Sequence, residues 1–284
     1  MHIITSIKEM QQWSLARRKD GKLVGFVPTM GFLHDGHISL VHESVKKSDV
    51  TVVSIFVNPT QFSATEDLST YPRDFERDKN LLVAAGADVI FFPDAGMMYP
   101  DGFETYIIPG KTSTILEGES RPTHFRGVAT VVSILFNAVL PDFAFFGQKD
   151  AQQCAVITRM TKDLAFPVQV VICPVVRESD GLAMSSRNVY LSETERKEAL
   201  VLNKSLTAAK NMIYEGERRS HDILHVMNGI LKSVSSASPD YTAIVQSDSF
   251  EKSEILESGK EYFVLVACRI GKTRLIDNIL ILIP

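Results

Sequence analysis

The sequence contains little that would support a disulfide-stabilised or membrane-embedded protein. It has only three cysteines in 284 residues (Cys154, Cys173 and Cys268). They are too few and too scattered for a disulfide framework or a four-cysteine zinc site, and a reducing compartment fits them best. No stretch approaches the ~20 apolar residues that a membrane-spanning helix requires. The start "MHIITSIKEMQQW" lacks the apolar core of a signal peptide, so we expect a cytoplasmic protein with no membrane contact.

A basic excess and the common nucleotide-binding signatures are also missing. The formal net charge of -4 argues against a broad nucleic-acid surface, so no nucleic-acid partner is expected. A small local phosphate site remains compatible with this charge. The sequence contains no G-x-x-x-x-G-K-[ST] loop, and no G-x-G-x-x-G follows the first predicted strand. A nucleotide site in this chain would therefore need another phosphate-binding device.

What the sequence does contain is the composition and alternation of an α/β protein. It is 45% hydrophobic and 23% charged, as in ordinary globular proteins, and is long enough for two domains. Continuous apolar runs alternate with helical periodicity, which predicts parallel strands buried on both faces. We expect a Rossmann-like, doubly wound parallel sheet that binds ligands at the carboxyl ends of its strands. The predicted strands are 23–28, 50–58, 88–93, 142–147 and 168–174, and the predicted helices are 36–48, 73–87, 127–140 and 148–164.

The pattern changes after about residue 176. Ser192 is a candidate N-cap, with Glu195 three residues later as its capping-box partner, and a further helix is predicted over 220–234. The runs "YFVLVACRIG" and "TRLIDNILIL" then predict a β-hairpin. We therefore predict a Rossmann-like domain over 1–176 and a smaller α+β domain over 177–284.

The first strand end carries two histidines. In "PTMGFLHDGH" (28–37), Gly36 allows close backbone approach to a ligand and His37 lies in the first turn of the next helix. Free N–H groups there favour phosphate, and imidazoles can stabilise developing charge. The stretch also fits a structural turn with surface histidines. His34 and His37 could chelate zinc, although no third ligand is evident nearby.

Two further strand ends carry polar groups. In "IFVNPTQF" (55–62), the amides of Asn58 and Gln61 could orient a hydroxyl or carboxylate, or Asn-Pro could simply begin a turn. In "FFGQKDAQQ" (145–153), Gly147 relaxes the turn and Gln153 follows one helical turn later. Lys149 would be a cation at a helix start, which opposes the helix dipole. This position favours a role toward an anionic ligand.

Two loops combine guanidinium groups with other polar side chains. "RESDGLAMSSRN" (177–188) places hydroxyls beside guanidinium groups, which suits a triphosphate but also an exposed polar linker. "LEGESRPTHFRGV" (116–128) fits helix capping and anion binding equally well. The residues concerned are Arg177, Ser185, Ser186 and Arg187 in the first loop, and Arg121, His124 and Arg126 in the second.

The order of these segments, together with "YPRD" (71–74), resembles the pantothenate synthetase (pantoate–β-alanine ligase) family over about residues 23–192. That family belongs to the HxGH nucleotidyltransferases, which are related in fold to class I aminoacyl-tRNA synthetases. "MSSRN" resembles their mobile KMSKS-type loop, with Arg187 where those enzymes often carry lysine. This difference matches the pantothenate branch.

The resemblance implies a two-step reaction that uses ATP with Mg²⁺. Pantoate would attack the α-phosphorus to give pantoyl adenylate and pyrophosphate, and β-alanine would then give pantothenate and AMP. A lid, formed by the segment around residues 60–70 and the C-terminal domain, would keep water from the adenylate. The expected partners are these small molecules and, in a homodimer, a second copy of the chain.

The resemblance also implies roles for individual residues. His34 and His37 would hold the phosphates, with His37 as a possible proton donor, while Lys149 and Arg187 would complete the catalytic set. Mg²⁺ would be held mainly by the ATP phosphates rather than by protein ligands alone. ATP would contact Met30, Gly31, His34, Gly36, His37, Gly147, Lys149, Asp150, Val176, Met184, Ser185, Ser186 and Arg187. Pantoate and β-alanine would contact Asn58, Gln61 and Gln153, with Met30 lining the same pocket.

Two alternatives to this function stay open at the level of sequence. One is an HxGH adenylyltransferase that acts on a different acid or on a mononucleotide, which the paired glutamines of "NPTQF" and "FGQKDAQQ" disfavour. The other is a catalytically silent nucleotide-binding module, which would bind ATP without releasing pyrophosphate.

Overall fold

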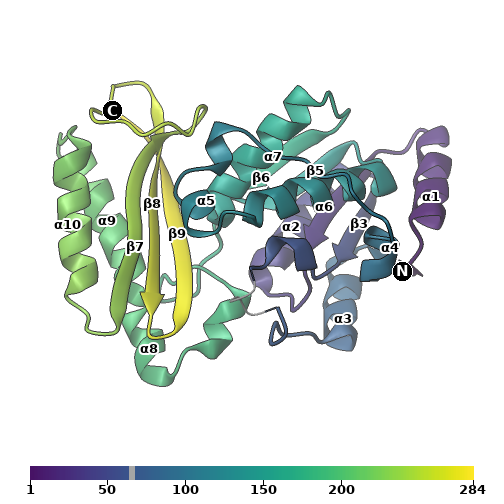
Figure 1. Cartoon of the computed structure of the whole chain (residues 1–284), viewed down its shortest axis with the longest axis horizontal. Coiled ribbons are helices and arrows are strands. Elements are labelled where there is room, and N and C mark those ends of the chain that lie inside the picture. Colours follow the sequence, from purple (N-terminus) through teal and green to yellow (C-terminus); the bar gives the residue numbers. More distant parts are fainter. Residues whose placement is uncertain (64–67) are drawn as a thin grey trace. The chain divides into compact units, whose positions relative to one another are not determined.

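A computed structural model describes residues 1–63 and 68–284, whose internal contacts divide the chain into two units (Figure 1). The first unit comprises Met1–Gly147 and Gln152–Pro174, and the second comprises Gln148–Ala151 and Val175–Pro284. The short segment 148–151 thus groups with the second unit, although the residues on both sides of it belong to the first.

The first unit is built on a parallel six-stranded sheet with the order β1-β4-β3-β2-β5-β6. This confirms the predicted fold class. The five predicted strands are all present, and a short edge strand at the N-terminus adds a sixth. The strands are β1 (His2–Ile4), β2 (Val24–Thr29), β3 (Val50–Ile55), β4 (Val89–Phe91), β5 (Phe143–Gly147) and β6 (Gln169–Cys173).

Helices cover both faces of this sheet (Figure 1). Helices α1 (Ile7–Lys19), α6 (His124–Val139) and α7 (Ala151–Asp163) contribute to the core on one face, and α2 (Asp35–Lys47) and α3 (Phe75–Ala85) to the core on the other. Shorter helical elements lie in the connections. They are η1 (Pro59–Gln61), α4 (Ala95–Met98), η2 (Lys111–Ser113), α5 (Glu117–Ser120) and η3 (Gln148–Asp150).

The two cores follow from the period-2 alternation of strand side chains. In β5, Ala144 and Phe146 pack on the face of α1, α6 and α7, whereas Phe145 packs on the face of α2 and α3. Phe26 and Val27 of β2 divide between the faces in the same way. Every one of these side chains is buried, which explains why β2 and β5 appear in the sequence as continuous apolar runs. The edge strand β6 differs, because most of its residues are exposed or half-buried.

The second unit packs two helices against a three-stranded antiparallel sheet (Figure 1). The predicted hairpin is confirmed, and a strand with a weaker apolar pattern joins it. The Ser192–Glu195 capping box is also confirmed, at the start of α8. The elements are η4 (Ser186–Tyr190), α8 (Glu193–Glu198), α9 (Leu200–Tyr214), α10 (Ser220–Lys232), β7 (Ala237–Gln246), β8 (Glu261–Ile270) and β9 (Thr273–Leu282).

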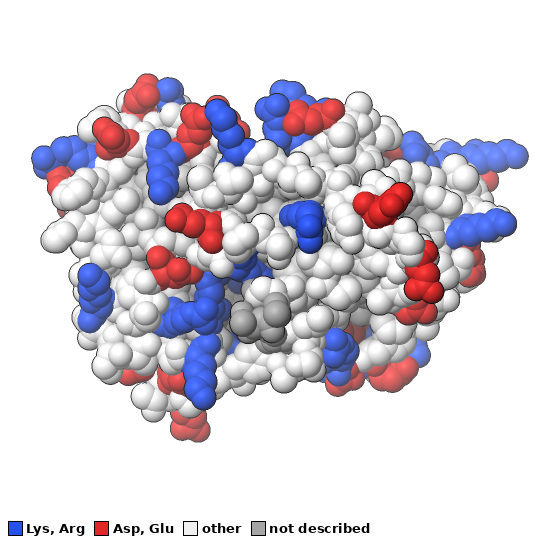
Figure 2. Space-filling view, in the orientation of Figure 1, with Lys and Arg blue, Asp and Glu red and all other residues white. Residues whose placement is uncertain are grey.

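The surface carries charges of both signs. On the face shown in Figure 2, Lys and Arg side chains lie among Asp and Glu side chains, in keeping with a net charge of -4. Within the described residues, no helix combines the length and the apolar character needed to cross a membrane.

Candidate active site

The sheet has a topological switch point between β2 and β5. The chain continues from β2 to β3 on one side, whereas β5 pairs with β2 on the other. Open α/β sheets bind ligands at such a point, beside the carboxyl ends of the strands. Thr29 ends β2 there and Gly147 ends β5. The HxGH turn (residues 34–37) therefore comes after one strand end, and Gly147 lies at the end of the neighbouring strand.

The two histidines cap helix α2 reciprocally. His34 is the N-cap, and its Nδ1 accepts a hydrogen bond from the Gly36 N–H at 3.2 Å. His37 Nδ1 accepts from the His34 N–H at 3.3 Å, and the ring centroids lie 4.0 Å apart. Because both Nδ1 atoms accept, each neutral ring carries its proton on Nε2. The cap therefore fixes both imidazoles as Nε2–H donors at a helix N-terminus.

The loop before the histidines has an unusual backbone that a buried carboxylate holds in place. Gly31 has φ +82° and the non-glycine Phe32 has φ +49°, a region that side chains other than glycine rarely adopt. Asp78 accepts hydrogen bonds from the Phe32 N–H at 2.6 Å and the Leu33 N–H at 2.8 Å. Arg77 donates to the Leu33 carbonyl at 2.9 Å. Asp78 and Arg77 were not identified from the sequence.

Burial raises the pKa of the Asp78 carboxyl, while the backbone hydrogen bonds and Arg77 act in the opposite direction. Asp78 is only 1% exposed. Removing its carboxylate would leave two N–H groups in a buried region without their acceptor, which is costly. Asp78 thus stabilises the conformation from which the HxGH turn starts.

The predicted amides Asn58 and Gln61 lie together with Met30. Asn58 Nδ2 donates to Gln61 Oε1 at 3.1 Å, which leaves Gln61 Nε2 to donate to the Met30 sulfur at 3.0 Å. A thioether is a weak acceptor. Tyr99 donates to Asn58 Oδ1 at 2.7 Å, and burial raises the pKa of this phenol, so it stays a donor. The Gln61 amide is therefore fixed in orientation, with its N–H on an acceptor that a ligand oxygen could replace.

Two of the three candidates in the 116–128 segment, Arg121 and His124, contact the carbonyl group of Gln61 in η1. His124 Nδ1 lies 3.0 Å from the Gln61 carbonyl, and Arg121 Nη1 lies 3.2 Å from His124 Nε2. Arginine only donates, so Nε2 accepts and the His124 proton is on Nδ1. The third candidate, Arg126, instead stacks on the Tyr106 ring, 4.9 Å from its centroid.

The adjacent glutamines of α7 have different environments. Gln152 is buried and donates to the Thr112 and Ile115 carbonyls, both at 2.7 Å. Gln153 is half-buried, and within the described ranges its side chain makes no hydrogen bond. Gln152 is therefore committed to the structure, whereas the Gln153 side chain has no such role among the described residues.

The remaining candidates belong to the second unit. Lys149 Nζ lies 3.6 Å from the carboxylate of its neighbour Asp150. The Met184 N–H donates to the Val176 carbonyl at 3.0 Å, which closes the loop between them. Ser185 caps η4 by accepting from the Arg187 N–H at 3.2 Å. The structure thus brings Val176 and the segment 184–187 together, and Ser186 begins the capped turn.

A metal site made by the protein would need several ligating side chains close together. No group of three His, Cys, Asp or Glu side chains that could hold a metal ion is present there. His34 and His37 use their Nδ1 atoms in the helix cap.

The parallel sheet and the HxGH turn at a strand end define an α/β protein of the Rossmann-like, nucleotide-binding type. A sequence model of the pantoate-beta-alanine ligase family matches residues 2–280. The chain belongs to the pantoate–β-alanine ligase family and is a ligase.

Individual relatives agree with this assignment. The pantothenate synthetases of Caldicellulosiruptor bescii and Geobacter sulfurreducens are 50% and 51% identical over 281 and 278 residues, covering 99% and 98% of both chains. The crystal structure of pantothenate synthetase from Thermus thermophilus superposes with a TM-score of 0.91 at 43% identity, covering 98% of this chain and 99% of that one. The pantoate-beta-alanine ligase from Francisella tularensis, complexed with beta-gamma ATP and beta-alanine, gives 0.80 at 35% identity, with coverages of 99% and 97%.

Proposed function

We propose that the chain condenses pantoate with β-alanine, using ATP, to give pantothenate, AMP and pyrophosphate. The first step forms pantoyl adenylate and releases pyrophosphate, and the β-alanine amine then attacks the acyl carbon and releases AMP. Membership of the ligase family supports the overall reaction. The observation that carries the adenylation step is the pair of Nε2–H imidazoles at the start of α2.

The histidines act on the phosphates. Nε2–H donors beside the N-terminus of α2 suit phosphoryl oxygens, whose negative charge is stabilised by the helix dipole and the N–H groups. Catalysis of phosphoryl chemistry depends mainly on alignment and charge stabilisation. His37 also donates a hydrogen bond from its Nε2–H to an oxygen of the departing pyrophosphate. Met30, Gly31, Gly36 and Gly147 let the nucleotide approach the backbone here.

The hydrogen-bonded amides of Asn58 and Gln61, here called the amide cluster, bind the acid. Gln61 exchanges its weak Met30 acceptor for an oxygen of pantoate, and Asn58 keeps the Gln61 side chain in position. Gln153 donates to a second oxygen. The oriented amide of Gln61 discriminates strongly against acids that lack the matching oxygen, because an unpaired buried amide is costly.

The second unit supplies positive charge to the triphosphate. Lys149 and Arg187 neutralise the phosphates, Ser185 and Ser186 donate hydroxyl hydrogen bonds, and Asp150, Val176 and Met184 contact the nucleoside. Mg²⁺ enters as the ATP complex, since phosphate oxygens are its preferred ligands. The chain acts in the cytoplasm as a homodimer.

Closure over the adenylate remains part of this hypothesis. The segment around residues 60–70 includes residues 64–67, which lie outside the described residues. Hydrogen exchange of this segment with and without ATP and pantoate tests the lid directly, and unchanged protection would exclude it.

Pyrophosphate exchange tests the adenylation step. We expect labelled pyrophosphate to enter ATP only when pantoate and Mg²⁺ are present, and to do so without β-alanine. Exchange that requires β-alanine would argue for a concerted condensation, and exchange driven better by another small acid would reassign the substrate.

A further inference from the structure

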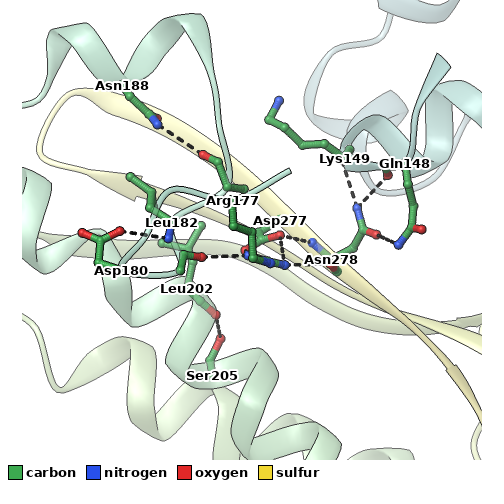
Figure 3. Close-up of polar contacts among 12 residues, drawn as sticks. Gln148, Lys149, Arg177, Asp180, Leu182, Asn188, Leu202, Ser205, Asp277 and Asn278 are labelled. Atoms are coloured by element: carbon green, nitrogen blue, oxygen red, sulfur yellow. Dashed lines mark hydrogen bonds and ion pairs between the residues drawn. The ribbon is translucent and has the colours of Figure 1, made fainter. Parts of the chain in front are cut away.

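One side chain of the last strand holds the backbone of the Lys149 segment (Figure 3). Asn278 of β9 donates from Nδ2 to the carbonyls of Gln148 and Lys149, both at 3.0 Å. Its Oδ1 accepts from Gln148 Nε2 at 3.1 Å. All three hydrogen bonds lie within the second unit and use both ends of one amide. They fix two successive peptide groups of the segment that carries Lys149.

Asn278 is itself fixed by an ion pair between half-buried Arg177 and buried Asp277. Arg177 makes a bidentate contact with Asp277, at 2.7 and 2.9 Å, and also donates to the Asn278 carbonyl at 3.3 Å. Asp277 accepts from the Asn278 N–H at 2.7 Å. The same Arg177 donates to the Gly181 carbonyl at 3.0 Å, in the loop that leads to residues 184–187. One network therefore connects both phosphate-binding segments of this unit.

The sheet does not need this network. The backbone of Asn278 pairs with Leu265 of β8 in the regular ladder, so the side chain is free to serve another purpose. Asp277 and Asn278 are 3% and 1% exposed, and buried ion pairs and amides are generally no more stabilising than apolar residues of similar size. The stability of the second unit therefore does not explain why polar rather than apolar residues occupy positions 277 and 278.

We propose that Asn278 is a positioning residue for Lys149, and that Arg177 and Asp277 hold Asn278 for this purpose. The proposal rests on the proposed role of Lys149 at the triphosphate. Asn278 fixes where the lysine side chain leaves the backbone, so its loss lets Lys149 move away from the phosphates without removing the ammonium group.

A double-mutant cycle tests this coupling. We expect N278A to lower kcat/KM for ATP about tenfold, in the range of couplings within one hydrogen-bonded network, and to leave the KM for β-alanine unchanged. In a K149A background, N278A should have almost no further effect. The matched control is L275A in the same strand, which removes a buried side chain of the core (5% exposed). It should lower the Tm but leave kcat/KM for ATP unchanged.

Binding of a non-hydrolysable ATP analogue, measured by calorimetry for the same variants, separates this proposal from the proposed function. If pantoate proves inert but analogue affinity follows the same cycle, the positioning role stands and the substrate assignment fails. The positioning role would be overturned if N278A and K149A lowered kcat/KM for ATP independently of each other. It would also be overturned if N278A and L275A lowered kcat/KM for ATP equally. If N278A does not fold, N278S, which is less disruptive in volume, carries the same cycle.

Discussion

The Asp78 carboxylate accepts a hydrogen bond of 2.6 Å from the backbone N–H of Phe32, a residue with φ +49°. The second oxygen of the carboxylate accepts from Leu33. A side chain of α3 thus stabilises a left-handed backbone conformation two residues before His34. The backbone that leads into the HxGH turn depends on a contact that spans more than forty positions of sequence, since the first of these hydrogen bonds has a separation of 46.

Replacing Asp78 by alanine should therefore affect both stability and catalysis. We expect D78A to lower the free energy of unfolding by about 2–3 kcal/mol, because two buried N–H groups lose their acceptor. The kcat/KM for ATP should fall about tenfold or more as the turn shifts. D74A is the control, because Asp74 caps the same helix through the Arg77 N–H. D74A should lower the free energy of unfolding by about 1 kcal/mol without changing kcat/KM for ATP. Equal losses of kcat/KM in D78A and D74A would contradict a specific role of Asp78 in the turn.

The raised pKa of Asp78 also predicts a pH dependence. The folded chain holds this proton to a higher pH than the unfolded chain, whose carboxyl has its ordinary value of 3.8. The part of the stability that is linked to this proton is therefore complete below pH 3.8 and is lost as the pH rises through the folded pKa of Asp78. Urea unfolding at a series of pH values should show wild type losing stability relative to D78N across this window. A constant difference between the two proteins would show that Asp78 has an unshifted pKa.

Asparagine at position 34 should separate the structural role of the imidazole from its catalytic role. Asparagine is among the best N-cap residues, so H34N should keep the stability of the wild type, whereas H34A should lose about 1 kcal/mol. Both variants should lose about 100-fold or more in kcat, because each lacks the Nε2–H donor. Thermal unfolding and steady-state kinetics measure the two effects. If H34N kept its activity, His34 would be only a helix cap.

Gly127 should control the position of the amide cluster. A methyl group at Gly127 would lie 2.4 Å from the Thr60 carbonyl oxygen and 2.6 Å from the Gln61 nitrogen. G127A must therefore displace η1, and we expect the KM for pantoate to rise about tenfold or more. In contrast, G229A in α10 meets nothing within 4 Å and should stabilise the chain by about 0.5–1 kcal/mol. An unchanged KM in G127A would show that the position of η1 does not limit pantoate binding.

The elements that the sequence predicted are those with a strong periodic pattern. Strands β2 to β6 are continuous apolar runs, and α6 buries most of its length. Two strands had no such signal. β1 has only three residues, two of them exposed, and β7 contains Pro239 and Asp240 in a run whose first half is mostly exposed or half-buried. Pairing with neighbours, rather than local preference, defines both strands.

The candidate site was predictable where residues cluster in sequence. His34 with His37, Asn58 with Gln61, and Ser185 with Arg187 are close neighbours along the chain, and each pair or its cap is hydrogen-bonded. Asp78 and Asn278 were missed because their partners lie 46 and 130 positions away. A buried polar residue in an amphipathic helix or strand was the only available signal, and it does not identify a partner.

The most direct test of the proposed reaction measures AMP and pantothenate together. The protein is incubated with ATP, Mg²⁺ and pantoate, with and without β-alanine. We predict equal amounts of AMP and pantothenate when β-alanine is present, and neither as a released product of turnover when it is absent. ATP binding without either product would contradict the assignment of pantoate and β-alanine as substrates.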